Sequence, residues 1–111
     1  MGAGQCECAA AGLLVAEKAG LDGGQVAAAV GRGAAASPQV IEKSRQMVEG
    51  EQGVTFAAKW RLKDIRYGLA LARKLGQATP LGQAALAAFQ KLIDQGLGEA
   101  NESRVIDVLR S

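Results

Sequence analysis

Apolar residues in this chain recur at the spacing of a helix, and no segment alternates apolar and polar residues with a period of two. The missing alternation argues against half-buried strands. Ala, Leu, Val and Ile supply most of the apolar content, because Trp, Tyr and Phe make up only 4% of the chain. Ala and Leu are strong helix formers. The sequence therefore predicts an all-α fold, a compact bundle of about five to six helices without a sheet.

Glycine marks the ends of three predicted helices, at Gly20, Gly76 and Gly96. Each follows a run of helical spacing, and glycine readily takes the left-handed conformation that a helix C-cap requires. Thr55 and Thr79 stand where a side-chain oxygen can cap the start of a helix. Together these signals predict helices at 6–19, 24–31, 37–49, 56–75, 80–95 and 103–110.

The helix predicted at 80–95 has one apolar face, whereas the helix at 56–75 has two. The face of the first contains Leu81, Ala84, Ala85, Ala88, Phe89 and Leu92. The stripes of the second contain Ala58, Leu62, Ile65, Leu69 and Ala72 on one side and Trp60, Tyr67 and Leu71 on another. A basic strip, which we define as Lys59, Lys63, Arg66, Arg73 and Lys74, falls between the two stripes. A helix with two apolar flanks packs in the middle of a bundle or reaches an interface.

Self-association follows from the second stripe. A domain of this size can readily cover only one side of the 56–75 helix. Trp60, Tyr67 and Leu71 left in water would form a patch of the size that marks interfaces. We therefore expect a homodimer, the commonest closed oligomer, with the Ala/Leu face of 9–16 as a further candidate contact.

Length and charge limit what the chain can be. Its 111 residues fit a single domain, 1–111, and the net charge of +2 is too small to indicate nucleic acid or a membrane. The basic strip is short, and Trp60 and Tyr67 are expected on a different side of the helix, so nucleic-acid binding is disfavoured. The sequence contains no apolar run long enough to cross a bilayer and no basic leader, which predicts a cytoplasmic protein.

The usual catalytic and metal-binding residues are scarce. The sequence has no His and only two Cys, Cys6 and Cys8. Without histidine there is no Ser/His/Asp or Cys/His arrangement. Two thiols alone give too few ligands for a zinc site, so we predict no metal.

A series of short motifs runs along the chain from Leu14. They are Ala16-Glu17-Lys18-Ala19-Gly20-Leu21-Asp22, Phe56 followed by Lys63-Asp64, Leu75-Gly76, Thr79-Pro80-Leu81, Gly96-Leu97-Gly98-Glu99 and Ser103-Arg104-Val105-Ile106. In order and spacing they resemble the C-terminal helical domain of the β-hydroxyacid dehydrogenases. That family includes 3-hydroxyisobutyrate dehydrogenase and tartronate semialdehyde reductase, and its helical domain has the fold of the 6-phosphogluconate dehydrogenase C-terminal domain.

The resemblance implies what the chain has and lacks. Members of the family join this helical domain to a Rossmann domain that binds NAD or NADP, and no Rossmann domain is expected here. The helical domain supplies a catalytic lysine, part of the substrate pocket and the dimer contact. Gly2 and Gly4 resemble the family's Gly-x-Gly-x-x-x-Lys segment, which aligns Cys8 with the lysine. Residues 1–13 would then be a degenerate or shortened linking helix, and 14–111 the family-like domain.

Three further positions match residues that lie by the cofactor in the family. They are Lys63, Asp64 and Phe56, and we take them as candidate cofactor-binding residues. Asn101 stands where the family often has Asp, a departure in the closing loop.

These observations predict a stand-alone, non-catalytic helical module that acts by self-association and binds no cofactor alone. Cysteine carries no positive charge and cannot polarise a substrate carbonyl as lysine does. One alternative is half of a split 3-hydroxyacid dehydrogenase that needs a separate Rossmann-domain partner. Another is a small binder of anions or nucleic acid that uses the basic strip.

Overall fold

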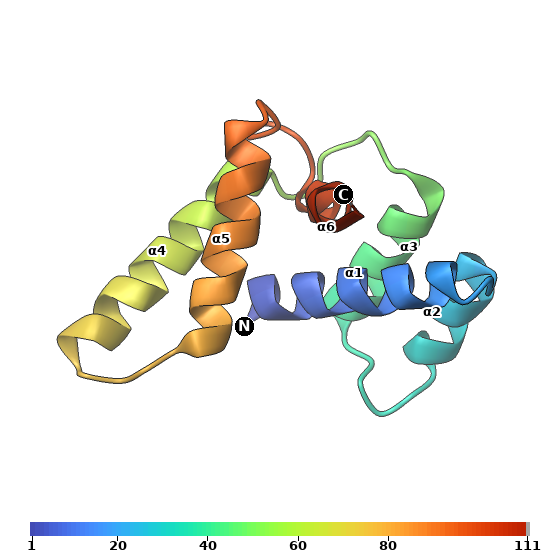
Figure 1. Cartoon of the computed structure of the whole chain (residues 1–111), viewed down its shortest axis with the longest axis horizontal. Helices are drawn as coiled ribbons and strands as arrows, with labels where there is room; N and C mark the ends of the chain where they lie inside the picture. The colour runs from blue at the N-terminus through green and yellow to red at the C-terminus, as the bar shows by residue number, and fades with distance from the viewer. Residues whose placement is uncertain (111) are drawn as a thin grey trace.

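The computed structural model describes residues 1–110, which form a bundle of helices (Figure 1). The α-helices are α1 (Gly2–Lys18), α2 (Gly23–Gly31), α3 (Pro38–Glu49), α4 (Ala58–Lys74), α5 (Pro80–Asp94) and α6 (Val105–Arg110), and the 3₁₀ turn η1 (Glu102–Arg104) precedes α6. The described residues contain no strand, only an isolated bridge between Ala57 and Asn101. The predicted all-α fold is confirmed. None of the helices in residues 1–110 is long and apolar enough to cross a membrane.

The three predicted glycine caps are confirmed. Gly20, Gly76 and Gly96 have φ of 78°, 73° and 82°, in the left-handed region. In each case the next residue donates its N–H to a carbonyl five residues back, as in the bond from Leu21 to Ala16 of 3.0 Å. This is the Schellman arrangement, which satisfies carbonyls left free at a helix end.

The predicted helix starts are partly wrong. Helix α1 begins at Gly2 rather than at residue 6, and α4 begins at Ala58 rather than at 56. Thr55 does not cap α4, because its hydroxyl bonds with Asn101, Lys43 and Gln46 instead. Thr79 occupies the N-cap position of α5, but its side chain makes no capping bond.

Helices α4 and α5 form a hairpin beside the rest of the bundle, and the N-terminal end of α1 lies next to it (Figure 1). The inner stripe of α4 is buried, as predicted, at Ala58, Leu62, Ile65 and Leu69. On α5, Ala85, Ala88, Phe89 and Leu92 are buried. Leu81, on the same predicted face, is 68% exposed and Ala84 is exposed as well, so the apolar face of α5 is not buried along its whole length.

Candidate functional site

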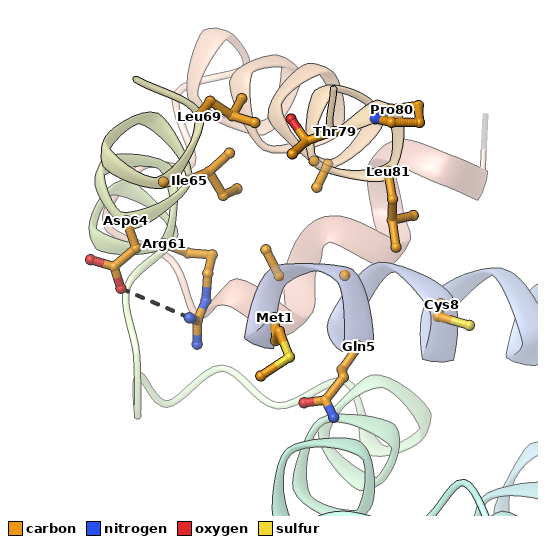
Figure 2. Close-up of a pocket in the computed structure, with 15 residues that line it drawn as sticks. Met1, Gln5, Cys8, Arg61, Asp64, Ile65, Leu69, Thr79, Pro80 and Leu81 are labelled. Carbon is orange, nitrogen blue, oxygen red and sulfur yellow. Dashed lines mark ion pairs between the residues drawn. The ribbon is translucent and has the colours of Figure 1, made fainter. Parts of the chain in front are cut away.

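A cavity of about 780 Å³ opens between the first turns of α1, the middle of α4 and the start of α5 (Figure 2). Most of its lining is apolar, and the charged side chains among the lining residues are Arg61 and Asp64. The lining comprises Met1, Ala3, Gly4, Gln5, Cys8, Arg61, Asp64, Ile65, Gly68, Leu69, Thr79, Pro80, Leu81, Gly82 and Ala85. An apolar cavity with a few polar groups has the composition of a small-molecule site.

Arg61 is held in place by Glu102, whose side chain is fully buried. The Arg61 Nε donates to Glu102 Oε2 at 2.5 Å, and Nη2 donates to Oε1 at 3.2 Å. The same carboxylate accepts a bond of 2.9 Å from Gln39 Nε2 and lies 3.4 Å from the Lys43 ammonium. The guanidinium of Arg61 also stacks on the ring of Phe56, 4.4 Å from its centroid. Glu102 therefore fixes one wall of the cavity to α3 and η1.

Burial and the neighbouring charges shift the pKa values of Glu102 and Arg61 in opposite directions. Burial by itself would raise the pKa of Glu102, but hydrogen bonds from Arg61 and Gln39 and the positive charges of Arg61 and Lys43 outweigh it and lower the pKa. Burial would lower the pKa of Arg61, yet its bond to Glu102 raises it. Both groups are thus held in their charged forms at neutral pH.

A second polar cluster adjoins the first and is centred on Asn101. This side chain is 1% exposed. Its Oδ1 accepts from Thr55 N (2.9 Å), Thr55 Oγ1 (3.1 Å) and Phe56 N (3.1 Å). Its Nδ2 donates to Gln46 Oε1 at 2.8 Å and to Ser103 Oγ at 2.7 Å. The side chain thereby joins the segment before α4 to α3 and η1, so the departure from Asp still gives a closing-loop contact.

The outer face of α4 consists of Trp60, Tyr67 and Leu71, which are 49%, 67% and 58% exposed, and Leu75 at the C-cap is 72% exposed. These residues point away from the buried stripe of α4. We expected the aromatic rings to lie on a different side of the helix from the basic strip, but one lysine of the strip contacts both rings. The Lys63 ammonium is 5.3 Å from the Trp60 ring centroid and 5.7 Å from that of Tyr67. That reason against nucleic-acid binding is therefore wrong, although the small net charge still argues against it.

The other surface expected at the interface is not available. Ala10, Leu13 and Ala16, from the predicted face of 9–16, are buried in the core. They pack inside the bundle because α1 contacts α3, α5 and α6 along its length. Only the outer face of α4 remains of the predicted contacts.

Comparison with known proteins identifies the family. Residues 1–109 match a family model described as NAD-binding of NADP-dependent 3-hydroxyisobutyrate dehydrogenase. The chain belongs to the family of this domain, which is found in β-hydroxyacid dehydrogenases of the 3-hydroxyisobutyrate dehydrogenase type. It is 31% identical over 102 residues to glyoxylate/succinic semialdehyde reductase 2, chloroplastic, of Arabidopsis thaliana, in an alignment that covers 92% of this chain and 28% of that protein. It is 37% identical over 79 residues to an uncharacterized oxidoreductase of Shewanella frigidimarina, with 71% and 27% covered.

A solved structure supports the fold. The crystal structure of 3-hydroxyisobutyrate dehydrogenase from Salmonella typhimurium matches with a TM-score of 0.91 at 23% sequence identity, over 96% of this chain and 38% of that one. The chain thus spans between 27% and 38% of the length of these relatives. The all-α fold and the resemblance inferred from the motifs are both confirmed.

The structure brings together only some of the positions matched to the cofactor site of the dehydrogenases. Asp64 lines the cavity, and Phe56 lies under Arg61 at its wall. Lys63 does not line the cavity, and its ammonium lies over the rings on the outer face of α4.

The segment Gly2-Ala3-Gly4 is helical. Gly2 and Gly4 belong to α1 and not to a phosphate-binding loop after a strand. A Cβ at Gly2 would lie 2.8 Å from Arg61 Nη1, so glycine is needed there for close packing.

The two cysteines have different surroundings. Cys8, aligned with the family lysine, is exposed and lines the cavity. Cys6 is buried, and its Sγ lies 3.7 Å from the carbonyl oxygen of Glu102. Burial, assisted by the negative charge of Glu102, raises the pKa of Cys6 to about 12. Cys6 therefore stays a neutral thiol.

Arg61 and Glu102 were missed by the sequence analysis. A signal for Arg61 was present, because it lies beside Leu62 and four residues before Ile65 on the buried side of α4. Glu102 shows no such signal, since it falls in the turn that precedes Val105 and Ile106.

Proposed function

We propose that this chain is a helical module of the β-hydroxyacid dehydrogenase family that transfers no hydride by itself and acts by self-association. The observation that supports it best is the outer face of α4. Three large apolar side chains, Trp60, Tyr67 and Leu71, lie there on the side opposite the core, and Leu75 follows them at the C-cap. Aromatic residues of this kind often dominate the energy of an interface. A homodimer that pairs two α4 helices would remove this surface from water.

The chemistry of the cavity supports the absence of hydride transfer. Moving a hydride to or from a carbonyl carbon needs a group that stabilises the developing charge on oxygen. The cationic side chain among the lining residues is Arg61, which is already bonded to Glu102. Cys8, at the position that the family motif aligns with lysine, would offer a thiol that carries no positive charge. We further propose that 1–111 is one domain, with 1–13 serving as a linking helix, and that it binds neither NAD nor NADP alone.

Half of a split dehydrogenase is the second candidate. It is favoured by the length of the relatives, of which this chain spans at most 38%. The family resemblance implies that the remaining length includes a Rossmann domain. A separate polypeptide with that domain would then supply the NAD or NADP site and complete a reductase.

Light scattering tests the self-association. We expect the wild type to be a dimer at micromolar concentration and Tyr67→Glu to be a monomer, because a charged side chain is costly to remove from water at the centre of an apolar contact. Val15→Glu is the matched control, since Val15 is also exposed but lies on α1. A wild type that stays monomeric at high micromolar concentration would refute the proposal. A dimer that persists in Tyr67→Glu would reject α4 as the interface.

An activity assay separates the two candidates. The chain alone should not oxidise NADPH or NADH with glyoxylate or succinic semialdehyde, the substrates in the names of two relatives. The assay is repeated after adding the isolated nucleotide-binding domain of a relative. Turnover only in the mixture would favour the split enzyme, and turnover by the chain alone would exclude both candidates.

A further inference from the structure

The cavity between α1, α4 and α5 carries a pair of opposite charges at one end. Arg61 Nη1 faces Asp64 Oδ2 across 3.8 Å, a separation longer than a hydrogen bond (Figure 2). Both residues come from α4, one turn apart. Ile65, Leu69 and Leu81 continue the lining away from this pair (Figure 2). The cavity therefore combines two unlike charges at one end with an apolar body.

Each charge of the pair keeps an edge for a ligand. Glu102 engages Nε and Nη2 of Arg61, which leaves Nη1 packed beside Gly2 on one side and turned towards Asp64 on the other. The side chain of Asp64 is 51% exposed, and its ion pair with Arg61 is long. A carboxylate could accept a bond from Nη1, while an ammonium donates to Asp64. Both bonds would be charge-assisted, the stronger class of hydrogen bond.

We propose that this cavity binds an α-amino acid with a large apolar side chain. Such a molecule carries its carboxylate and its ammonium on one Cα, which matches two unlike charges close together. Its side chain would fill the apolar body beside Ile65 and Leu69. A volume of about 780 Å³ leaves room for an aromatic or long aliphatic side chain. This inference does not depend on hydride transfer or on dimerisation.

Singly charged amphiphiles fit the pair less well. A fatty acid would place its carboxylate next to Asp64, and an alkyl amine would place its ammonium next to Arg61. In each case two like charges would approach in a partly buried site, which is unfavourable. The zwitterion avoids both contacts.

A titration followed by amide NMR shifts, with L-phenylalanine as the probe, tests the proposal. Saturable shifts are expected at the cavity residues Gly68, Gly82 and Ala85. N-acetyl-L-phenylalanine lacks the ammonium, and L-phenylalaninamide lacks the carboxylate. Each should bind about tenfold more weakly, the loss of one charge-assisted bond. L-alanine should also bind more weakly, because it leaves the apolar body of the cavity empty.

Two variants locate the binding. Asp64→Asn should weaken the binding of L-phenylalanine to the level of its N-acetyl form. The control Asp107→Asn, at an exposed side chain of α6 outside the cavity lining, should not. Gly68→Leu should also block binding, because Gly68 lines the cavity and a Cβ at this position meets no atom within 4 Å. Equal affinity for the three phenylalanine derivatives, or shifts confined to residues outside the cavity, would overturn the proposal. The absence of saturable shifts would overturn it as well.

Discussion

The residues around Asn101 and the α4–α5 hairpin are buried by different means. Asn101 and Glu102 join α3, η1 and the start of α4 through hydrogen bonds and ion pairs between fully buried polar groups. The hairpin packs Leu62 and Ile65 of α4 together with Phe89 of α5 through apolar contacts. A polar cluster depends on the identity of each atom, because an unpaired buried group is costly. An apolar contact depends mainly on volume.

The two regions also differ in whether they leave surface available to ligands or partners. The polar clusters have their partners within the chain. In the hairpin, one side of α4 is buried and the other side, with Trp60 and Tyr67, is exposed. It also borders the cavity. The candidate surfaces for ligands and partners therefore belong to the apolar hairpin, which the polar clusters hold in position.

The largest effect is expected from Asn101→Ala. This change removes five hydrogen bonds and leaves the N–H groups of Thr55 and Phe56 without their acceptor. We expect the free energy of unfolding to fall by about 3–4 kcal/mol, measured by urea denaturation. Asn101→Asp keeps the acceptors and loses the two donated bonds, so it should cost about half as much. A loss below about 1 kcal/mol in Asn101→Ala would contradict the role given to the polar cluster.

A smaller effect is expected from Glu102→Gln, which leaves Arg61 and Lys43 without their shared counter-charge. The loss should be about 2–3 kcal/mol at neutral pH, since Arg61 keeps some exposure to water. The folded-state pKa of Glu102 lies below its ordinary value. Its ionised form therefore stabilises the fold above that ordinary value, and this stabilisation is lost as the pH falls through the lowered pKa.

Urea denaturation at several pH values measures this dependence. The difference in stability between the wild type and Glu102→Gln should shrink in acid. Glu99→Gln is the control, because the Glu99 side chain is 81% exposed and pairs with Lys59 only at the surface. A difference for Glu102→Gln that is the same at all pH values would mean that its charge is not involved.

The smallest effect is expected from Leu92→Met in the hairpin. Leu92 is fully buried, but methionine has a similar volume and adapts to its neighbours. The cost should stay below about 1.5 kcal/mol in the same urea measurement. If Leu92→Met destabilised the protein as much as Asn101→Ala, the hairpin would depend on the identity of its side chains as much as the polar cluster does.

Local signals predicted much of the fold. The glycine caps at Gly20, Gly76 and Gly96 depend on backbone conformation within one turn, so the sequence around each was sufficient. The buried stripe of α4 followed from helical periodicity. Leu81 shares the predicted apolar face of α5 but is exposed, because periodicity gives the direction of a side chain and not what lies opposite it.

Long-range contacts limited the prediction of the site. Asn101 meets Gln46 and Thr55, 55 and 46 residues earlier in the chain, and no spacing rule connects them. Arg61 and Glu102 are 41 residues apart, and no pattern in the sequence predicts that they pair. The family resemblance identified Asp64 and Phe56 but not the arginine between them. The role of Arg61 depends on its contact with Glu102, which only the packing of the helices establishes.

The two cysteines differ in exposure, so that a thiol-reactive label can be attached to one of them and not to the other. A thiol-reactive dye attacks the ionised form of cysteine, which burial withholds from Cys6. Cys8 is exposed at the mouth of the cavity, only two residues along the same helix. One reagent can thus attach a single fluorophore at that mouth without any engineered substitution. The emission of that fluorophore would report whatever enters the cavity.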